Sequence, residues 1–127
     1  MAKKVLIVED DTFLAETIQS SLEEHGAASQ KAAGVSTRRA ANGQEAVEMI
    51  DTVQPDLLLL DLLMPQKDGF YVLQHIKEKK YGFPVVILSN LSGDMTPEKC
   101  FAMGAVDYLV KSDMDETDLW PRIQKYL

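Results

Sequence analysis

The sequence predicts a single α/β domain built on an open, doubly wound parallel sheet of five strands. Four short and almost wholly apolar runs recur along the 127 residues, and such runs are typical of strands covered on both faces. Longer amphipathic segments separate them, so that strand and helix alternate five times. This order favours right-handed crossovers with helices on both faces of the sheet.

The strand candidates are apolar blocks that each stop at a polar residue. The four strong blocks cover residues 5–8, 57–60, 85–88 and 108–110. A more polar candidate at 35–40 suits the edge of a sheet, where one side of the strand meets water.

Apolar residues at intervals of three and four predict the first three helices. Asp11 or Thr12 is the expected N-cap of the first helix. The second helix must stop before Pro55, because the residue before a proline disfavours helical geometry. The third helix is expected to end near Lys79.

The last two helices are marked by prolines. Thr96 is the expected cap of the fourth helix, with Pro97 at its first helical position. The fifth helix contains Pro121, which a helix tolerates only near its start. We therefore expect the fifth helix to begin near Thr117 or Asp118.

Composition excludes several classes of protein. Thirteen basic and 20 acidic residues give a net charge of −7, which argues against direct binding of nucleic acid or of an anionic membrane. The single cysteine excludes a disulfide framework. The apolar run after the N-terminal lysines is too short for a signal peptide. We expect a cytoplasmic single domain over 1–127 without an output domain.

Polar residues that could carry chemistry follow the strand candidates. Glu9 and Asp10, Asp61, Ser89 and Lys111 each stand where an apolar block stops. The carboxyl ends of parallel strands meet at one edge, where ligands of open α/β sheets bind. Close carboxylates repel each other unless a cation lies between them, and oxygen ligands favour Mg²⁺. A carboxylate beside Mg²⁺ and a lysine is a candidate nucleophile toward phosphorus.

Four segments resemble the receiver domain of bacterial two-component response regulators, of the single-domain type found in chemotaxis regulators. They are KVLIVEDD at 4–11, LLLDLLMPQKDG at 58–69, VILSN at 86–90 and AMGAVDYLVK at 102–111. The resemblance covers nearly the whole chain in order. It implies a flavodoxin-like (βα)₅ fold with strand order 2-1-3-4-5.

The resemblance also implies a Mg²⁺ site. Asp61 and Asp10 would be direct ligands, Glu9 would act through water, and Leu63 would contribute its backbone carbonyl. From the residues alone, Asp11 is either a further ligand or the cap of the first helix, and we prefer the cap.

The same resemblance assigns the phosphoryl chemistry. Asp61 would be the phosphoacceptor, Lys111 would pair with the phosphoryl group, and Ser89 and Tyr108 would be the switch residues. Each has a simpler interpretation: Asp61 as a turn residue, Ser89 as a loop hydroxyl and Tyr108 as a half-buried strand aromatic.

The expected function is a signalling switch that turns over no separate substrate and is therefore not an enzyme in the usual sense. A histidine kinase or histidine phosphotransfer protein would supply the phosphoryl group. A downstream protein would bind the face formed by the fourth helix, fifth strand and fifth helix. Leu63 stands where many aspartyl-phosphate phosphatases carry a second aspartate, and no glycine-rich nucleotide loop follows any strand. A non-phosphorylated, receiver-like interaction module remains the alternative.

Three features depart from the family pattern. Ser112 follows the lysine where proline is usual, which we expect to free that loop. Asn90 follows the switch hydroxyl where a small residue is usual, which would alter access to the site. About eight extra residues, 27–34, favour helix, so we expect the first helix to run through Gly26 to a C-cap near Gly34, a projection of roughly 12 Å. That insertion is either a partner contact or a tolerated surface insertion.

Five other residues are expected to play no part in this site. Arg38 and Arg39 are interpreted as a solvated sheet edge, and His25 and His75 as exposed helix residues. Cys100 is expected to pack in the core.

Overall fold

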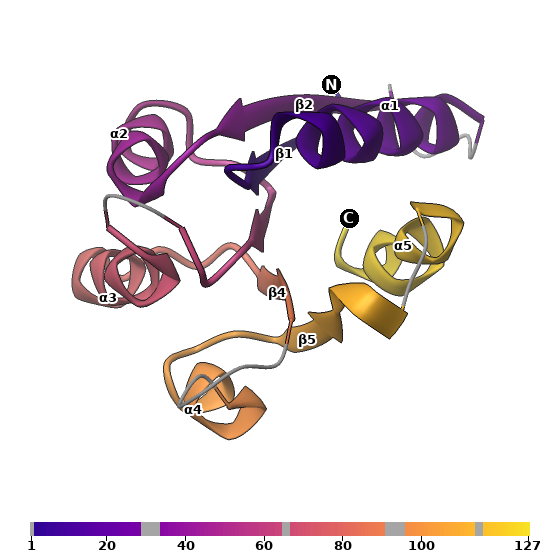
Figure 1. Cartoon of the computed structure of the whole chain (residues 1–127). Coiled ribbons are helices and arrows are strands. Elements are labelled where there is room, and N and C mark those ends of the chain that lie inside the picture. The colour runs from indigo at the N-terminus through magenta and orange to yellow at the C-terminus, as the bar shows by residue number, and fades with distance from the viewer. Residues whose placement is uncertain (1, 29–33, 65–66, 91–95, 114–115) are drawn as a thin grey trace.

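Five parallel strands form one sheet in the order β2-β1-β3-β4-β5, with a helix after each strand. The structure, a computed structural model shown in Figure 1, describes residues 2–28, 34–64, 67–90, 96–113 and 116–127. This confirms the predicted flavodoxin-like fold and the predicted position of the polar strand at the sheet edge. The strands are β1 (Lys3–Val8), β2 (Val35–Ala40), β3 (Leu57–Leu60), β4 (Val85–Ser89) and β5 (Asp107–Val110).

The helices cover both faces of the sheet. Figure 1 shows α1 and α5 on one side, with α2, α3 and α4 on the other. They are α1 (Thr12–Ala28), α2 (Gly43–Val53), α3 (Gly69–Lys79), α4 (Pro97–Ala102) and α5 (Glu116–Ile123), with the short 3₁₀ helices η1 (Lys111–Asp113) and η2 (Gln124–Tyr126).

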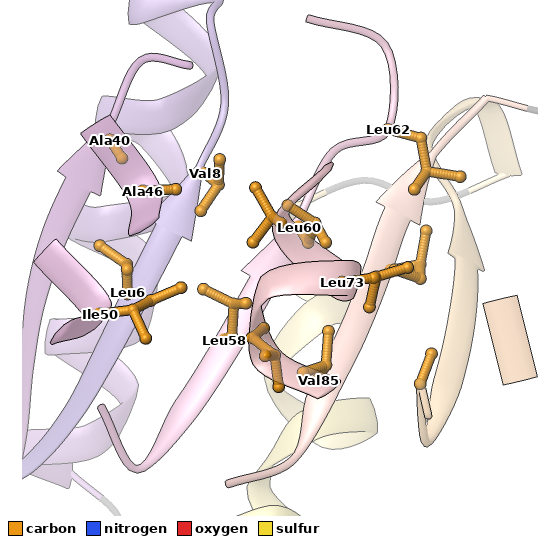
Figure 2. Packing of buried hydrophobic residues seen from close by; sticks show 14 of the residues in the cluster. Leu6, Val8, Ala40, Ala46, Ile50, Leu58, Leu60, Leu62, Leu73 and Val85 are labelled. Carbon is orange, nitrogen blue, oxygen red and sulfur yellow. The ribbon is translucent and has the colours of Figure 1, made fainter. Parts of the chain in front are cut away.

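The leucine run of β3 explains why the central strands are apolar throughout. Successive side chains of a strand point to opposite faces. Leu58 and Leu60 accordingly join the core cluster under α2, α3 and α4, part of which Figure 2 shows. Leu57 and Leu59 join the second cluster, under α1 and α5. All four side chains are buried, so neither face of this strand tolerates a polar residue.

Helix starts agree with the caps predicted from the sequence. The Asp11 carboxylate accepts a hydrogen bond from the backbone N–H of Leu14 at 3.1 Å, which is the geometry of an N-cap. Thr96 caps α4 in the same way through the N–H of Lys99, with Pro97 at the start of the helix. The prediction that Asp11 caps the first helix is confirmed.

The first helix corrects one prediction. It continues through Gly26, as expected, and its described part ends at Ala28; residues 29–33 of the insertion lie outside the described residues. A helix continuing from Ala27 would carry Gly34 about 10 Å along its axis. Instead, a Cβ built on Gly34 would lie 4.0 Å from the Cα of Ala27. The prediction that the helix runs on to a C-cap near Gly34 is therefore wrong.

Gly26 itself has a packing role. A Cβ at this position would lie 2.6 Å from Cγ2 of Val35, which is closer than two carbon atoms can pack. The absence of a side chain lets α1 lie close against the start of β2. The sequence showed only the cost of glycine within a helix.

Two further expectations change in detail. The fifth helix begins at Glu116, slightly before the expected start, and Pro121 lies inside it.

His25 and His75 are half-buried and not exposed. The His25 ring stacks on Trp120 at 6.1 Å between centroids, and His75 Nε2 lies 2.9 Å from an Asp51 carboxylate oxygen that also accepts a hydrogen bond from Tyr81. Cys100 is buried in the core, as expected.

Across the described residues, no helix is both long enough and apolar enough to cross a membrane.

Candidate functional site

The predicted site residues come together at the carboxyl edge of the sheet. Asp61 follows β3, the central strand, and lies between Glu9 after β1 and Ser89 at the end of β4. Lys111 follows β5, which is two strands or about 10 Å from β3. Only a long side chain can span that distance, which explains why a lysine reaches Asp61 from there.

Asp61 is buried, and both of its carboxylate oxygens have partners. The Ser89 hydroxyl donates to Oδ1 at 3.1 Å, and the backbone N–H of Leu63 donates to the same oxygen at 3.3 Å. Lys111 Nζ donates to Oδ2 at 3.1 Å. The side chain retains an exposed fraction of 6%, so the carboxylate is held in one orientation at the floor of the site.

Lys111 also binds Glu9, and this contact sets the charge balance of the site. Its ammonium forms an ion pair with Oε1 of Glu9. Burial raises the pKa of Glu9 to about 7, and the Asp61 charge adds to the rise, although Lys111 opposes both. Burial lowers the pKa of Lys111, but the hydrogen bond to Glu9 and the charge of Asp61 outweigh it, and the pKa lies above its usual value. The ammonium therefore stays charged between two buried acids.

Three acidic side chains form a group that could hold a metal ion. One carboxylate oxygen from each of Glu9, Asp10 and Asp61 lies within 4.8 Å of the others. Glu9 and Asp61 are buried, whereas Asp10 is exposed. An all-oxygen donor set with one side open to water suits Mg²⁺, which keeps several water ligands. The residues present fit such an ion.

Of the other two predicted site residues, Leu63 donates its backbone N–H to Asp61, whereas Tyr108 lies in β5. Leu63 is half exposed and lies two residues beyond Asp61. Tyr108, in β5, is half-buried and packs against the core cluster under α2, α3 and α4. Burial raises the pKa of Tyr108, with smaller contributions from Cys100 and Asp61. Its hydroxyl therefore remains protonated near neutral pH.

The two unusual residues of the site, Asn90 and Ser112, contact each other. The backbone N–H of Ser112 donates to the Asn90 side-chain oxygen at 3.1 Å. A proline at 112 would have no N–H to donate, and a small residue at 90 would have no oxygen to accept. The loop after Lys111 is thus tied to the end of β4, which corrects the expectation that Ser112 leaves it free.

Sequence reasoning missed one residue that contacts the site. The prediction that Arg39 belongs to a solvated edge is wrong, because its guanidinium donates to the backbone carbonyls of Glu9 and Asp10. Its neighbour Arg38 is exposed, as expected. Strand alternation was the available signal, because it places Arg38 and Arg39 on opposite faces of β2.

Comparison with known families agrees with this geometry. The family model described as "Response regulator receiver domain" matches residues 5–124. The chain belongs to the response regulator receiver family. Within this family it is 32% identical over 111 residues to chemotaxis protein CheY of Halobacterium salinarum, an alignment that covers 87% of this chain and 86% of that protein.

Relatives that are longer than this chain share the same region. Identity to the alkaline phosphatase synthesis transcriptional regulatory protein PhoP of Bacillus subtilis is 30% over 111 residues, covering 87% of this chain and 43% of PhoP. The chain thus spans less than half the length of that relative. The receiver domain of Francisella response regulator 1452 superposes with a TM-score of 0.83 at 30% identity, covering 98% of this chain and 95% of that one. Receiver domains of this family are signalling switches.

Proposed function

We propose that this receiver accepts a phosphoryl group on Asp61 and acts as a switch driven by that phosphorylation. The observation that carries the proposal is the environment of Asp61: a buried carboxylate bound by a lysine and a serine, next to two further carboxylates. A turn residue or a simple helix cap would need none of these partners. Membership of the receiver family supports the same role.

In the proposed transfer, one oxygen of Asp61 attacks the phosphorus of a phosphohistidine on a histidine kinase or phosphotransfer protein. The new O–P bond forms as the P–N bond breaks, and its electron pair returns to the imidazole nitrogen. Lys111 would pair with one phosphoryl oxygen and the Ser89 hydroxyl would donate to another, since both groups already bind Asp61 oxygens. Fixed donors of this kind favour the charge distribution of the transfer.

We assign Mg²⁺ binding to the carboxylates of Asp10 and Asp61, the backbone carbonyl of Leu63, and Glu9 through water. When bound, the ion would neutralise phosphoryl charge beside Asp61. The exposure of Asp10 supports a direct contact from the open side. The pairing of Glu9 with Lys111 supports a less direct role for Glu9.

The switch itself would consist of a shift between two populations of the same fold. Ser89 now donates to Asp61, and a phosphoryl group would draw its hydroxyl toward a new oxygen. Tyr108, which is half-buried one strand away, would change between exposed and buried positions as the loop moves. The surface that binds the downstream protein would be the α4-β5-α5 face, where Phe101 and Val106 are 47% and 46% exposed. Exposed apolar side chains of this kind are typical of a protein contact.

The experiment is intact mass spectrometry after incubation with acetyl phosphate or phosphoramidate, with and without Mg²⁺. The wild type should gain one phosphoryl group only with Mg²⁺, and Asp61→Asn should gain none. Asp11→Asn is the matched control, because it alters an adjacent carboxylate while asparagine still caps α1. Failure of the wild type to gain mass with several donors, with Mg²⁺ binding confirmed, would favour a non-phosphorylated interaction module.

A further inference from the structure

Arg39 joins the edge strand β2 to the acidic loop that follows β1. Its Nε donates to the carbonyl of Glu9 at 3.0 Å, and its Nη2 donates to the carbonyl of Asp10 at 2.9 Å. The planar guanidinium therefore binds two successive backbone carbonyls with one fork, a geometry that a lysine cannot reproduce.

The two hydrogen bonds of Arg39 lie just beyond the end of the backbone pairing between β1 and β2. The last ladder bond between β1 and β2 runs from the N–H of Glu9 to the carbonyl of Ala40, at 3.0 Å. Beyond it the two chains diverge, and β1 becomes the loop that carries Glu9 and Asp10. Arg39 continues the link between the strands with its side chain, past the point where backbone pairing ends. Both peptide groups that present the acidic side chains are thereby fixed to β2.

The hydrogen bonds from Arg39 hold this loop against the electrostatic repulsion among the acidic side chains of the site. Glu9, Asp10 and Asp61 bring three carboxylates within 4.8 Å of one another, and like charges at this distance repel. Lys111 binds the Glu9 and Asp61 side chains, but it reaches the site from β5, the edge strand on the side of the sheet away from β2. Arg39 restrains the main chain of the loop from the β2 side.

We propose that Arg39 is a positioning residue, which holds the Glu9–Asp10 main chain so that both side chains stand beside Asp61, with Asp10 placed to bind one divalent cation directly and Glu9 to bind it through water. The metal part of this inference rests on the proposed function. Arg39 reaches the metal site only through the backbone, so its role differs from that of a ligand. Outer contacts of this kind typically change metal affinity by about 10–100-fold when removed.

Removing Arg39 could also change Mg²⁺ affinity in the opposite direction, so the direction of the measured change decides the test. A guanidinium beside a cation site repels the cation, so its removal would tighten Mg²⁺ binding if charge dominated. Arg38 separates the two effects. Arg38 carries the same charge at the preceding position of β2 and is exposed. Within the described parts of the chain its side chain makes no hydrogen bond or ion pair.

The experiment compares Arg39→Ala, Arg39→Lys and Arg38→Ala by titrating each folded protein with Mg²⁺ and following backbone amide resonances. Arg39→Ala should raise the dissociation constant about 10-fold, whereas Arg38→Ala should change it by less than about 2-fold because its charge is screened. Arg39→Lys, which keeps the charge but not the fork, should lie between them. Equal or tighter binding by Arg39→Ala than by Arg38→Ala would overturn the proposal.

A second readout does not need the metal. In metal-free protein, amide hydrogen exchange at residues 9–12 should accelerate in Arg39→Ala and stay unchanged in Arg38→Ala. Unchanged exchange in Arg39→Ala overturns the positioning role. If the wild type binds no Mg²⁺, the metal assignment of the proposed function fails, and faster exchange in Arg39→Ala still supports the restraint of the loop.

Discussion

Replacing Lys111 by methionine tests how the buried acids of the site are balanced. The side chains of Glu9 and Asp61 are only 4% and 6% exposed, and Lys111 contacts both. Methionine keeps most of the volume of lysine but carries no charge. The variant therefore leaves two buried carboxylates without the ammonium that pairs with them.

The expected loss can be estimated from this geometry. Removing one partner of a buried ion pair typically costs about 3–5 kcal/mol, because the remaining charge stays desolvated. Glu9 can escape part of this cost by taking a proton, since burial already raises its pKa to about 7. We expect the metal-free variant to lose about 3 kcal/mol of unfolding free energy at pH 8 and clearly less at pH 5, where Glu9 is protonated in both proteins.

Equilibrium unfolding in urea with a chelator present measures this loss. The single tryptophan, Trp120, is buried and provides a fluorescence signal for the transition. Lys99→Met is the matched control, because it removes the same charge from an exposed position on α4. If Lys111→Met unfolds within about 0.5 kcal/mol of Lys99→Met at pH 8, the pairing has no energetic role and the reasoning fails.

Three further predictions follow from other contacts. The pKa of Glu9 is raised to about 7 from 4.5, so its contribution to metal-free stability should be complete below pH 4.5 and lost as pH rises through 7, by at most about 3 kcal/mol. In urea titrations, Glu9→Gln should flatten this part of the profile of stability against pH. An unchanged profile in the variant would contradict this prediction. Asn90→Ala should destabilise the wild type by about 0.5–1 kcal/mol but should have no effect in a Ser112→Pro background, which lacks the donor; equal effects in both backgrounds would rule out the Asn90–Ser112 bond. Gly26→Ala should lower the melting temperature despite a gain of about 1 kcal/mol in helix propensity, because the new methyl group meets Val35 at 2.6 Å; a higher melting temperature would show that the contact relaxes freely.

Much of this fold could be predicted because its signals are local. The apolar blocks 57–60 and 85–88 become β3 and β4 with nearly the expected bounds, since such runs are typical of strands covered on both faces. Parallel pairing then brings the residues after each strand to one edge, so Asp61, Ser89 and Lys111 were expected to meet. Their contacts in the structure follow from topology more than from any single residue.

What could not be predicted depends on contacts between segments. The sequence shows that Gly26 has a cost within a helix, but the reason for a glycine at this position is the close contact with Val35 on β2. An arginine on an edge strand has the same sequence signature whether it meets water or a loop, so the sequence alone predicts the wrong environment for Arg39. Asn90 and Ser112 are two unrelated departures in the sequence, because only the fold brings positions 22 residues apart into contact.

The most direct test of the central claim is to locate the phosphoryl group chemically. After incubation with acetyl phosphate and Mg²⁺, borohydride reduction would convert an aspartyl phosphate to homoserine, which peptide mass spectrometry assigns to one position. We predict homoserine at position 61 in the wild type and in Asp11→Asn, and none when Mg²⁺ or the donor is omitted. Reduction at Asp10 or at another carboxylate, or none at any position in metal-saturated protein, would contradict the account.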